Sequence, residues 1–89
     1  MTSTPRTATP AEQLGDAVGR IAVYAARALC AQFPHLNLER LVATFTRPAA
    51  VEGTARCYLA ALDSGAAPAE AARKAGTALI HAWADARTA

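Results

Sequence analysis

Apolar residues at helical spacing run through almost the whole chain, and prolines divide them into segments. From residue 11 onward these side chains recur at intervals of three and four, with no alternating run and no hairpin dipeptide such as Asn-Gly. Pro34 stops the first segment, whereas Pro48 and Pro68 stand where a fixed φ suits the first turn of a helix. The pattern therefore predicts an all-α fold.

Four helices are predicted between these breaks, at about 11–33, 38–45, 48–63 and from 68 to the end of the chain. The second is short, with Asn37 as its N-cap and Leu36 placed to pack on Leu41. Gly65 is expected to take a left-handed cap after the third. Short connections predict that neighbouring helices fold back on each other as a small four-helix bundle. The third helix should bury one apolar face, made of Val51, Ala55, Tyr58, Leu59 and Leu62.

The first ten residues differ in composition from the rest of the chain. Seven of them are Ser, Thr or Pro, and Met1 is the only large apolar residue among them. Such a segment has too little apolar surface to order itself by burial. We therefore expect a disordered N-terminal tail over 1–10 and a single helical domain over 11–89.

Alanine dominates the apolar content of this domain. The region contains 24 alanines and 19 larger apolar residues, so its core is expected to be thin. Below roughly 70–80 residues a core rarely supplies more than about 3–5 kcal/mol, and association often adds to it. Residues 21–33 are apolar nearly all the way round the helix. That segment is either the central helix of the bundle or is covered in part by another chain.

Residues 68–83 allow two interpretations that imply different functions. With Ala72 as the small residue and Gly76 in a turn, they resemble a helix-turn-helix, which would indicate DNA binding. Of the three positions that such a turn should fill with apolar residues, Thr77 and Asp85 are polar and Ala82 is apolar but small. A continuous helix fits better, because it gathers one apolar stripe of Ala72, Gly76, Leu79, Ile80 and Trp83.

In a continuous helix Gly76 needs a structural reason, because glycine costs roughly 1 kcal/mol there relative to alanine. Close helix packing is one such reason. Similar stripes of small residues occur as Gly15, Gly19, Ala22, Ala26 and Cys30, and as Gly53, Cys57 and Ala61. They would form close contacts within the bundle or a tight dimer seam, although alanine-rich composition alone also produces such stripes.

Charge and hydropathy limit the partners and the location. The formal net charge is +2, with eight Arg and one Lys scattered along the chain, which is far from a nucleic-acid footprint. The longest apolar stretch, 21–33, is too short to span a membrane, and no signal peptide is recognisable, so we expect a cytoplasmic protein. The high Ala and Arg content of the sequence is typical of proteins encoded by the GC-rich genome of a bacterium, phage or plasmid.

No residues converge on a catalytic, cofactor or metal site in the sequence. Cys30 and Cys57 are expected to be buried thiols rather than a disulfide. His35 follows a helix end and His81 lies on a polar helix face, which is not the paired spacing of a zinc site. We therefore expect no enzyme, no cofactor and no bound metal.

One face of the first helix combines charged and aromatic residues. Asp16, Arg20, Tyr24 and Arg27 follow one another at spacings of four, four and three. Asp16 can pair with Arg20, whereas Arg27 has no acid within a turn. Arg and Tyr are enriched at binding hot spots, so Arg20, Tyr24 and Arg27 are the candidate partner-binding residues. The same residues would also form the solvated face of an amphipathic helix.

These features favour a non-catalytic protein–protein interaction module: a small adaptor, inhibitor or accessory subunit that binds a larger protein, itself or both. The alternative is a small DNA-binding regulator of the helix-turn-helix type. The two differ in salt dependence, because binding through several phosphates weakens steeply as salt rises. A third class, a module for a metal or small ligand, would carry stoichiometric metal or ligand when purified.

Overall fold

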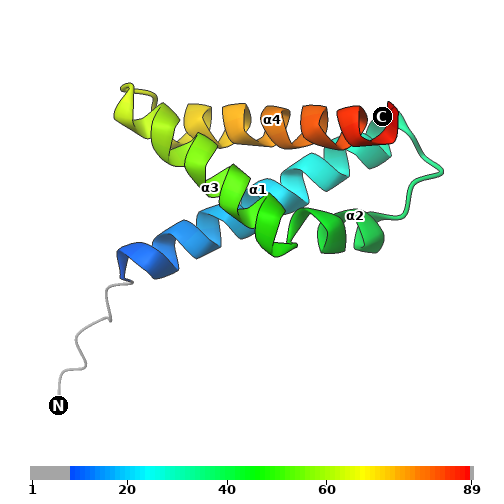
Figure 1. Ribbon diagram of the computed structural model, residues 1–89, viewed down its shortest axis with the longest axis horizontal. Helices are drawn as coiled ribbons and strands as arrows, with labels where there is room; N and C mark the ends of the chain where they lie inside the picture. The colour runs from blue at the N-terminus through cyan, green and yellow to red at the C-terminus, as the bar shows by residue number, and fades with distance from the viewer. Residues whose placement is uncertain (1–8, 89) are drawn as a thin grey trace, which may run out of the picture.

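The computed structural model describes residues 9–88, and this part of the chain is built of helices without a strand (Figure 1). The prediction of an all-α bundle of four helices with a short second helix is confirmed. Within the described residues, no helix has the length and apolarity that a membrane span requires. The helices are α1 (Pro10–Gln32), α2 (Leu38–Phe45), α3 (Pro48–Asp63) and α4 (Pro68–Thr88).

The first helix starts slightly earlier than its periodicity indicates. Pro10 is its first residue, and Thr9 is its N-cap, with the Thr9 hydroxyl oxygen accepting a hydrogen bond from the Glu12 N–H at 3.1 Å. Pro10 suits the first turn because its missing N–H has no partner there in any helix. The prediction of a disordered tail over 1–10 is therefore wrong for Thr9 and Pro10. Residues 1–8 of this tail lie outside the described residues.

Local sequence signals set the ends of the next two helices. The Asn37 side-chain oxygen accepts from the Arg40 N–H at 3.0 Å, which confirms Asn37 as the N-cap of α2. Leu36 is partly buried against the hydrophobic cluster that contains Leu41, as the expected packing requires. Gly65 follows α3 with φ of +98°, a conformation that side chains with a Cβ rarely adopt.

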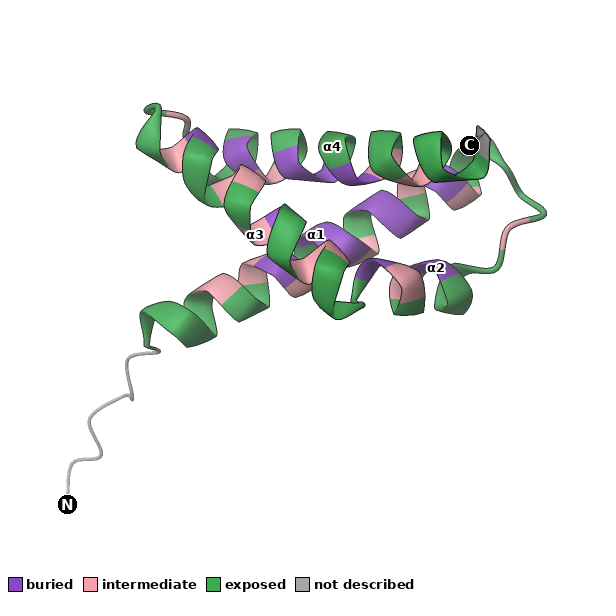
Figure 2. Cartoon of the chain, viewed as in Figure 1, coloured by how far each residue is buried: buried purple, intermediate pink, exposed green. Residues whose placement is uncertain are grey.

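The first helix packs against each of the other three, which accounts for its apolar circumference within one chain. Its buried residues begin at Val18, so its first two turns project beyond the core (Figures 1 and 2). α3 and α4 meet at the turn that joins them and diverge away from it (Figure 1). Half of the twelve buried apolar residues are alanines, so the core is as thin as the composition indicates. The larger ones are Val18, Ile21, Leu29, Leu41, Phe45 and Leu79.

The third helix buries a different face from the one its larger apolar residues predict. Its buried residues are Thr54 and Ala61, whereas Leu59 is 45% exposed and Tyr58 is only partly buried. α3 packs mainly on α4, whose buried residues include the small Ala71 and Ala75. Short side chains on both helices let the backbones approach closely, so the larger side chains of α3 lie at the edges of the contact.

The fourth helix is continuous through Gly76, which confirms the single-helix interpretation over the helix-turn-helix. Its apolar stripe faces the other helices, with Gly76 and Leu79 buried and Ile80 and Trp83 packed on the core. Ala71 and Ala75 broaden the stripe. The opposite side is solvent-exposed, as the pattern predicts, and comprises Glu70, Arg73, Lys74, Thr77, His81 and Asp85.

Thr54 is the one buried polar residue of the described chain whose side-chain oxygen lacks a hydrogen-bond partner. Its side chain is 4% exposed. A buried hydroxyl without a partner costs about 1–3 kcal/mol, because it loses its hydrogen bonds to water without replacement.

We expect Thr54→Val to raise the free energy of unfolding by about 1 kcal/mol or more, because valine keeps the shape and removes the unsatisfied hydroxyl. Thr54→Ser is the matched control: it keeps the hydroxyl, loses a methyl group and should lower stability. Urea denaturation of the three proteins measures both effects. A less stable Thr54→Val would show that the hydroxyl is satisfied in solution.

Candidate functional site

The candidate residues of α1 form an exposed row on the outer side of that helix. Arg20, Tyr24 and Arg27 are all exposed, and the three share a shallow hollow with Asp16. The structure therefore brings the predicted residues together on one face. The expected pair between Asp16 and Arg20 does not form, because neither residue takes part in a salt bridge within the described chain.

Tyr24 also packs against α4, at Gly76. A Cβ placed on Gly76 would lie 2.9 Å from Cδ2 and 3.1 Å from Cε2 of the Tyr24 ring. Any side chain at this position must displace the ring, so the prediction that Gly76 marks close helix packing is confirmed. Tyr24 remains 50% exposed, which leaves the other side of its ring available to a partner.

Beside this contact lies a groove of about 500 Å³, bounded by α1, α3 and α4. Arg20 and Tyr24 of α1 line it together with Tyr58 of α3 and Arg73 of α4. Its remaining lining is apolar or small and comprises Ala17, Ile21, Pro68, Ala69 and Ala72. Two aromatic and two cationic side chains from three helices therefore surround an apolar floor. We call this set of residues the Arg-Tyr groove.

Neither arginine of the Arg-Tyr groove forms a salt bridge within the described chain. The lining contains no carboxylate. The carboxylate of Glu70, one turn before Arg73, pairs with Lys74 instead, at 3.6 Å. The guanidinium groups of Arg20 and Arg73 are therefore free to bind an external anion.

Arg27 lies outside the groove, further along α1, and lines only the shallow hollow of that helix. Gly15 and Gly19 line the same hollow, and a Cβ on either would meet nothing within 4 Å. The expectation of close intramolecular packing is therefore wrong at these two glycines, and also at Gly53, which is equally open. The three glycines border space that another chain could enter, whereas Ala22 and Ala26 of the first stripe are buried in the core.

A second groove, of about 430 Å³, lies where α3 and α4 diverge next to α2. Its lining is uncharged and half of it is alanine, with Phe45, Leu79 and Trp83 as the large side chains. The Arg87 guanidinium lies 4.7 Å from the centre of the Trp83 ring, a cation–π contact at the end of α4. The structure therefore offers one charged and one uncharged groove.

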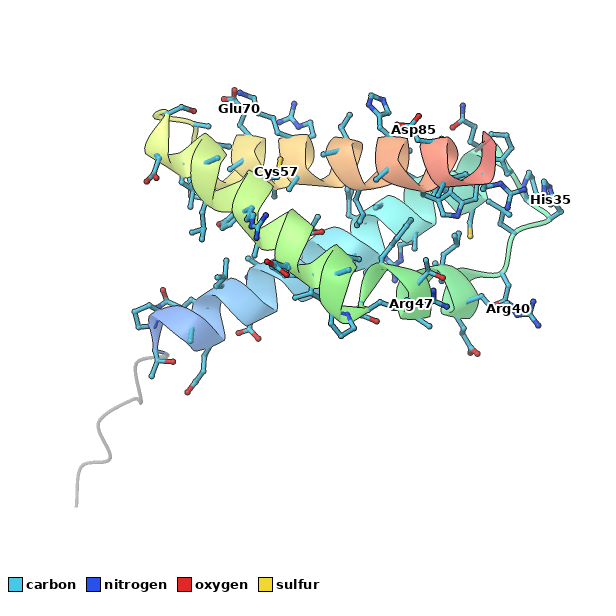
Figure 3. All side chains as sticks on the ribbon, in the orientation of Figure 1. His35, Arg40, Arg47, Cys57, Glu70 and Asp85 are labelled. Atoms are coloured by element: carbon cyan, nitrogen blue, oxygen red, sulfur yellow. The ribbon has the colours of Figure 1, made fainter. Side chains whose placement is uncertain are left out.

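The described residues contain no group of three or more His, Cys, Asp or Glu that could hold a metal ion. Both cysteines are free thiols and are partly rather than fully buried; Cys30 donates to the Leu36 carbonyl oxygen at 3.6 Å. His35 lies in the α1–α2 connection, and Glu70 and Asp85 lie along the outer side of α4 (Figure 3). These polar groups lie outside the Arg-Tyr groove.

The comparisons with known proteins give no match: no family model, no curated protein and no solved structure is significantly similar to the chain.

Sequence reasoning missed Tyr58 and Arg73, which complete the groove from other helices. Tyr58 belongs to the apolar face predicted for the third helix, and Arg73 lies outside the apolar stripe predicted for the fourth. Both are within about one turn of small residues that bring their helices close, but only the three-dimensional arrangement shows that they meet Arg20 and Tyr24.

We expect Gly76→Ala to stabilise the protein by about 1 kcal/mol in a Tyr24→Ala background, where only the helix propensity of alanine acts. With Tyr24 present, the gain should be smaller or reversed, because the new methyl group must displace the ring. Gly76→Leu should destabilise the protein with Tyr24 by about 1–3 kcal/mol through overpacking. Thermal or urea unfolding of the double-mutant cycle measures the coupling. An equal gain in both backgrounds would show that Tyr24 does not cover Gly76.

Proposed function

We propose that the protein is a non-catalytic protein–protein interaction module that acts as a small adaptor, inhibitor or accessory subunit. The observation that carries this proposal is the Arg-Tyr groove, where Arg20 and Tyr24 meet Tyr58 and Arg73 around an apolar floor. Arginine and tyrosine dominate binding hot spots because they combine large contact area with directional polar groups. Arg27 extends this surface along α1.

The glycines beside these residues support the proposal. Gly15 and Gly19 lie in the same hollow as Arg20 and Arg27, and space is open where their side chains would be. A partner helix can approach a backbone more closely at glycine than at any other residue. The outer face of α1 therefore combines room for close approach with side chains that anchor a contact.

Self-association is a second form of the same proposal. The core relies on alanines for half of its buried apolar residues, and a second copy that covers the uncharged groove between α3 and α4 would add apolar burial. The composition favours a protein of a bacterium, phage or plasmid, and the proposed module acts in the cytoplasm. Its partner is then another cytoplasmic protein or a second copy of the chain.

The alternative, a small DNA-binding regulator, has less support. α4 is one continuous helix, so it contains no helix-turn-helix. The net charge is only +2, and binding to phosphates would need more clustered basic residues. Salt separates the two functions, because affinity for DNA falls steeply as salt rises whereas an apolar protein contact changes little.

Arg27→Ala tests the proposed surface because the side chain is exposed and forms no salt bridge within the described chain. We expect a nearly unchanged melting temperature. The affinity for the partner, identified by cross-linking in the organism that encodes the protein, should fall about 30-fold, as for a hot-spot residue. Arg20→Ala should behave similarly.

The matched control is Arg40→Ala, on α2, which is exposed and lies away from this face (Figure 3). It should leave both stability and affinity unchanged. Sedimentation equilibrium on the wild type shows whether the partner is a second copy. The proposed function is wrong if the protein is a monomer of 9.2 kDa and cross-links to no protein in its host. The assignment of the binding surface to α1 is wrong if Arg20→Ala and Arg27→Ala bind the partner normally.

A further inference from the structure

The Arg-Tyr groove carries positive charge but no carboxylate in its lining. We propose that it binds an acidic segment of a partner protein, whose carboxylates meet Arg20 and Arg73 and whose apolar side chain lies on the floor between them. This inference rests on the proposed interaction function and specifies the chemistry of the partner.

The two arginines define the charge pattern of the occupant. Arg20 comes from α1 and Arg73 from α4, and both line the same groove. A guanidinium group binds a carboxylate through two parallel hydrogen bonds, which makes this pair directional. A segment with two carboxylates can therefore pair one with Arg20 of α1 and the other with Arg73 of α4.

The floor of the groove selects a peptide rather than a free carboxylate ion. Ile21 and Ala72 contribute apolar surface between the arginines, and the rings of Tyr24 and Tyr58 extend it. Burial of an apolar side chain on this surface adds affinity that a small ion lacks. A volume of about 500 Å³ holds a few side chains, so the occupant is a short segment that inserts its side chains.

Protein fits this surface better than nucleic acid does. Asp16 lies one turn before Arg20 on α1, and Glu70 lies one turn before Arg73 on α4. A phosphate backbone has closely spaced charges and would meet these two carboxylates as well as the arginines. A peptide can place its carboxylates at the arginines alone and present neutral side chains to Asp16 and Glu70.

The test is selection from a random peptide display library on the purified full-length protein. We expect the enriched peptides to carry at least two Asp or Glu residues around an apolar or aromatic residue. For the best synthetic peptide, Arg20→Ala and Arg73→Ala should each weaken binding about 30-fold, as removal of a hot-spot arginine does. The same selection on an Arg20→Glu, Arg73→Glu double variant should enrich basic peptides instead.

Arg40→Ala and Arg47→Ala are matched controls, because both arginines are exposed and lie at the α2 end of the molecule (Figure 3). They remove the same charge and should leave peptide affinity unchanged. Circular dichroism of each variant shows whether it is folded. Equal losses in the control variants would mean that net charge alone attracts the peptides, and would overturn the inference.

The inference is also wrong if no peptide is enriched, or if the enriched peptides are neutral or basic. If the peptide selection gives this result but the protein still binds its native partner through Arg27, the proposed interaction function stands. Only the inference that the groove binds an acidic segment is then wrong. A mixed-sequence DNA duplex is the last probe. Tight, strongly salt-dependent binding that Arg20→Ala and Arg73→Ala abolish would assign the groove to nucleic acid.

Discussion

Gly76 leaves the surface of α4 without a Cβ at the point where the ring of Tyr24 lies against it. α1 and α4 pack against each other, and both bury small residues, among them Ala25 of α1 and Ala75 of α4. The ring covers the glycine with one side and remains half-exposed on the other. A single contact therefore joins two helices and also positions Tyr24 in the wall of the Arg-Tyr groove.

Small residues determine much of the remaining architecture. α3 packs on α4; α4 buries Ala71 and Ala75, and α3 buries Thr54 and Ala61. The buried area that alanines contribute is small, so stability depends on close approach of backbones rather than on large side chains. This arrangement leaves larger side chains such as Tyr58 at the helix edges, where they line a groove instead of a core.

Local signals in the sequence were sufficient to predict the helices but not the way they face each other. Prolines, the Asn37 cap and Gly65 placed the end of α1, the start of α2, both ends of α3 and the start of α4 to within a residue, and the stripe of α4 was correct. The Thr-x-x-Glu pattern from Thr9 to Glu12 could have placed the start of α1, because it is typical of a helix N-terminus. The buried face of α3 could not be predicted by hydrophobicity, because α4 selects small residues there. Nor could the groove, which needs side chains from three helices.

The central claim is that the Tyr24 ring lies on Gly76 and so joins α1 to α4 beside the groove. Proton NMR of this ring tests the claim most directly. The structure predicts nuclear Overhauser effects between the Tyr24 ring protons and the α-protons of Gly76, because the ring carbons lie within van der Waals distance of that position. It also predicts ring-current shifts of the Gly76 α-protons. Absence of both in the folded protein, with Tyr24 averaging freely among rotamers, would contradict the account.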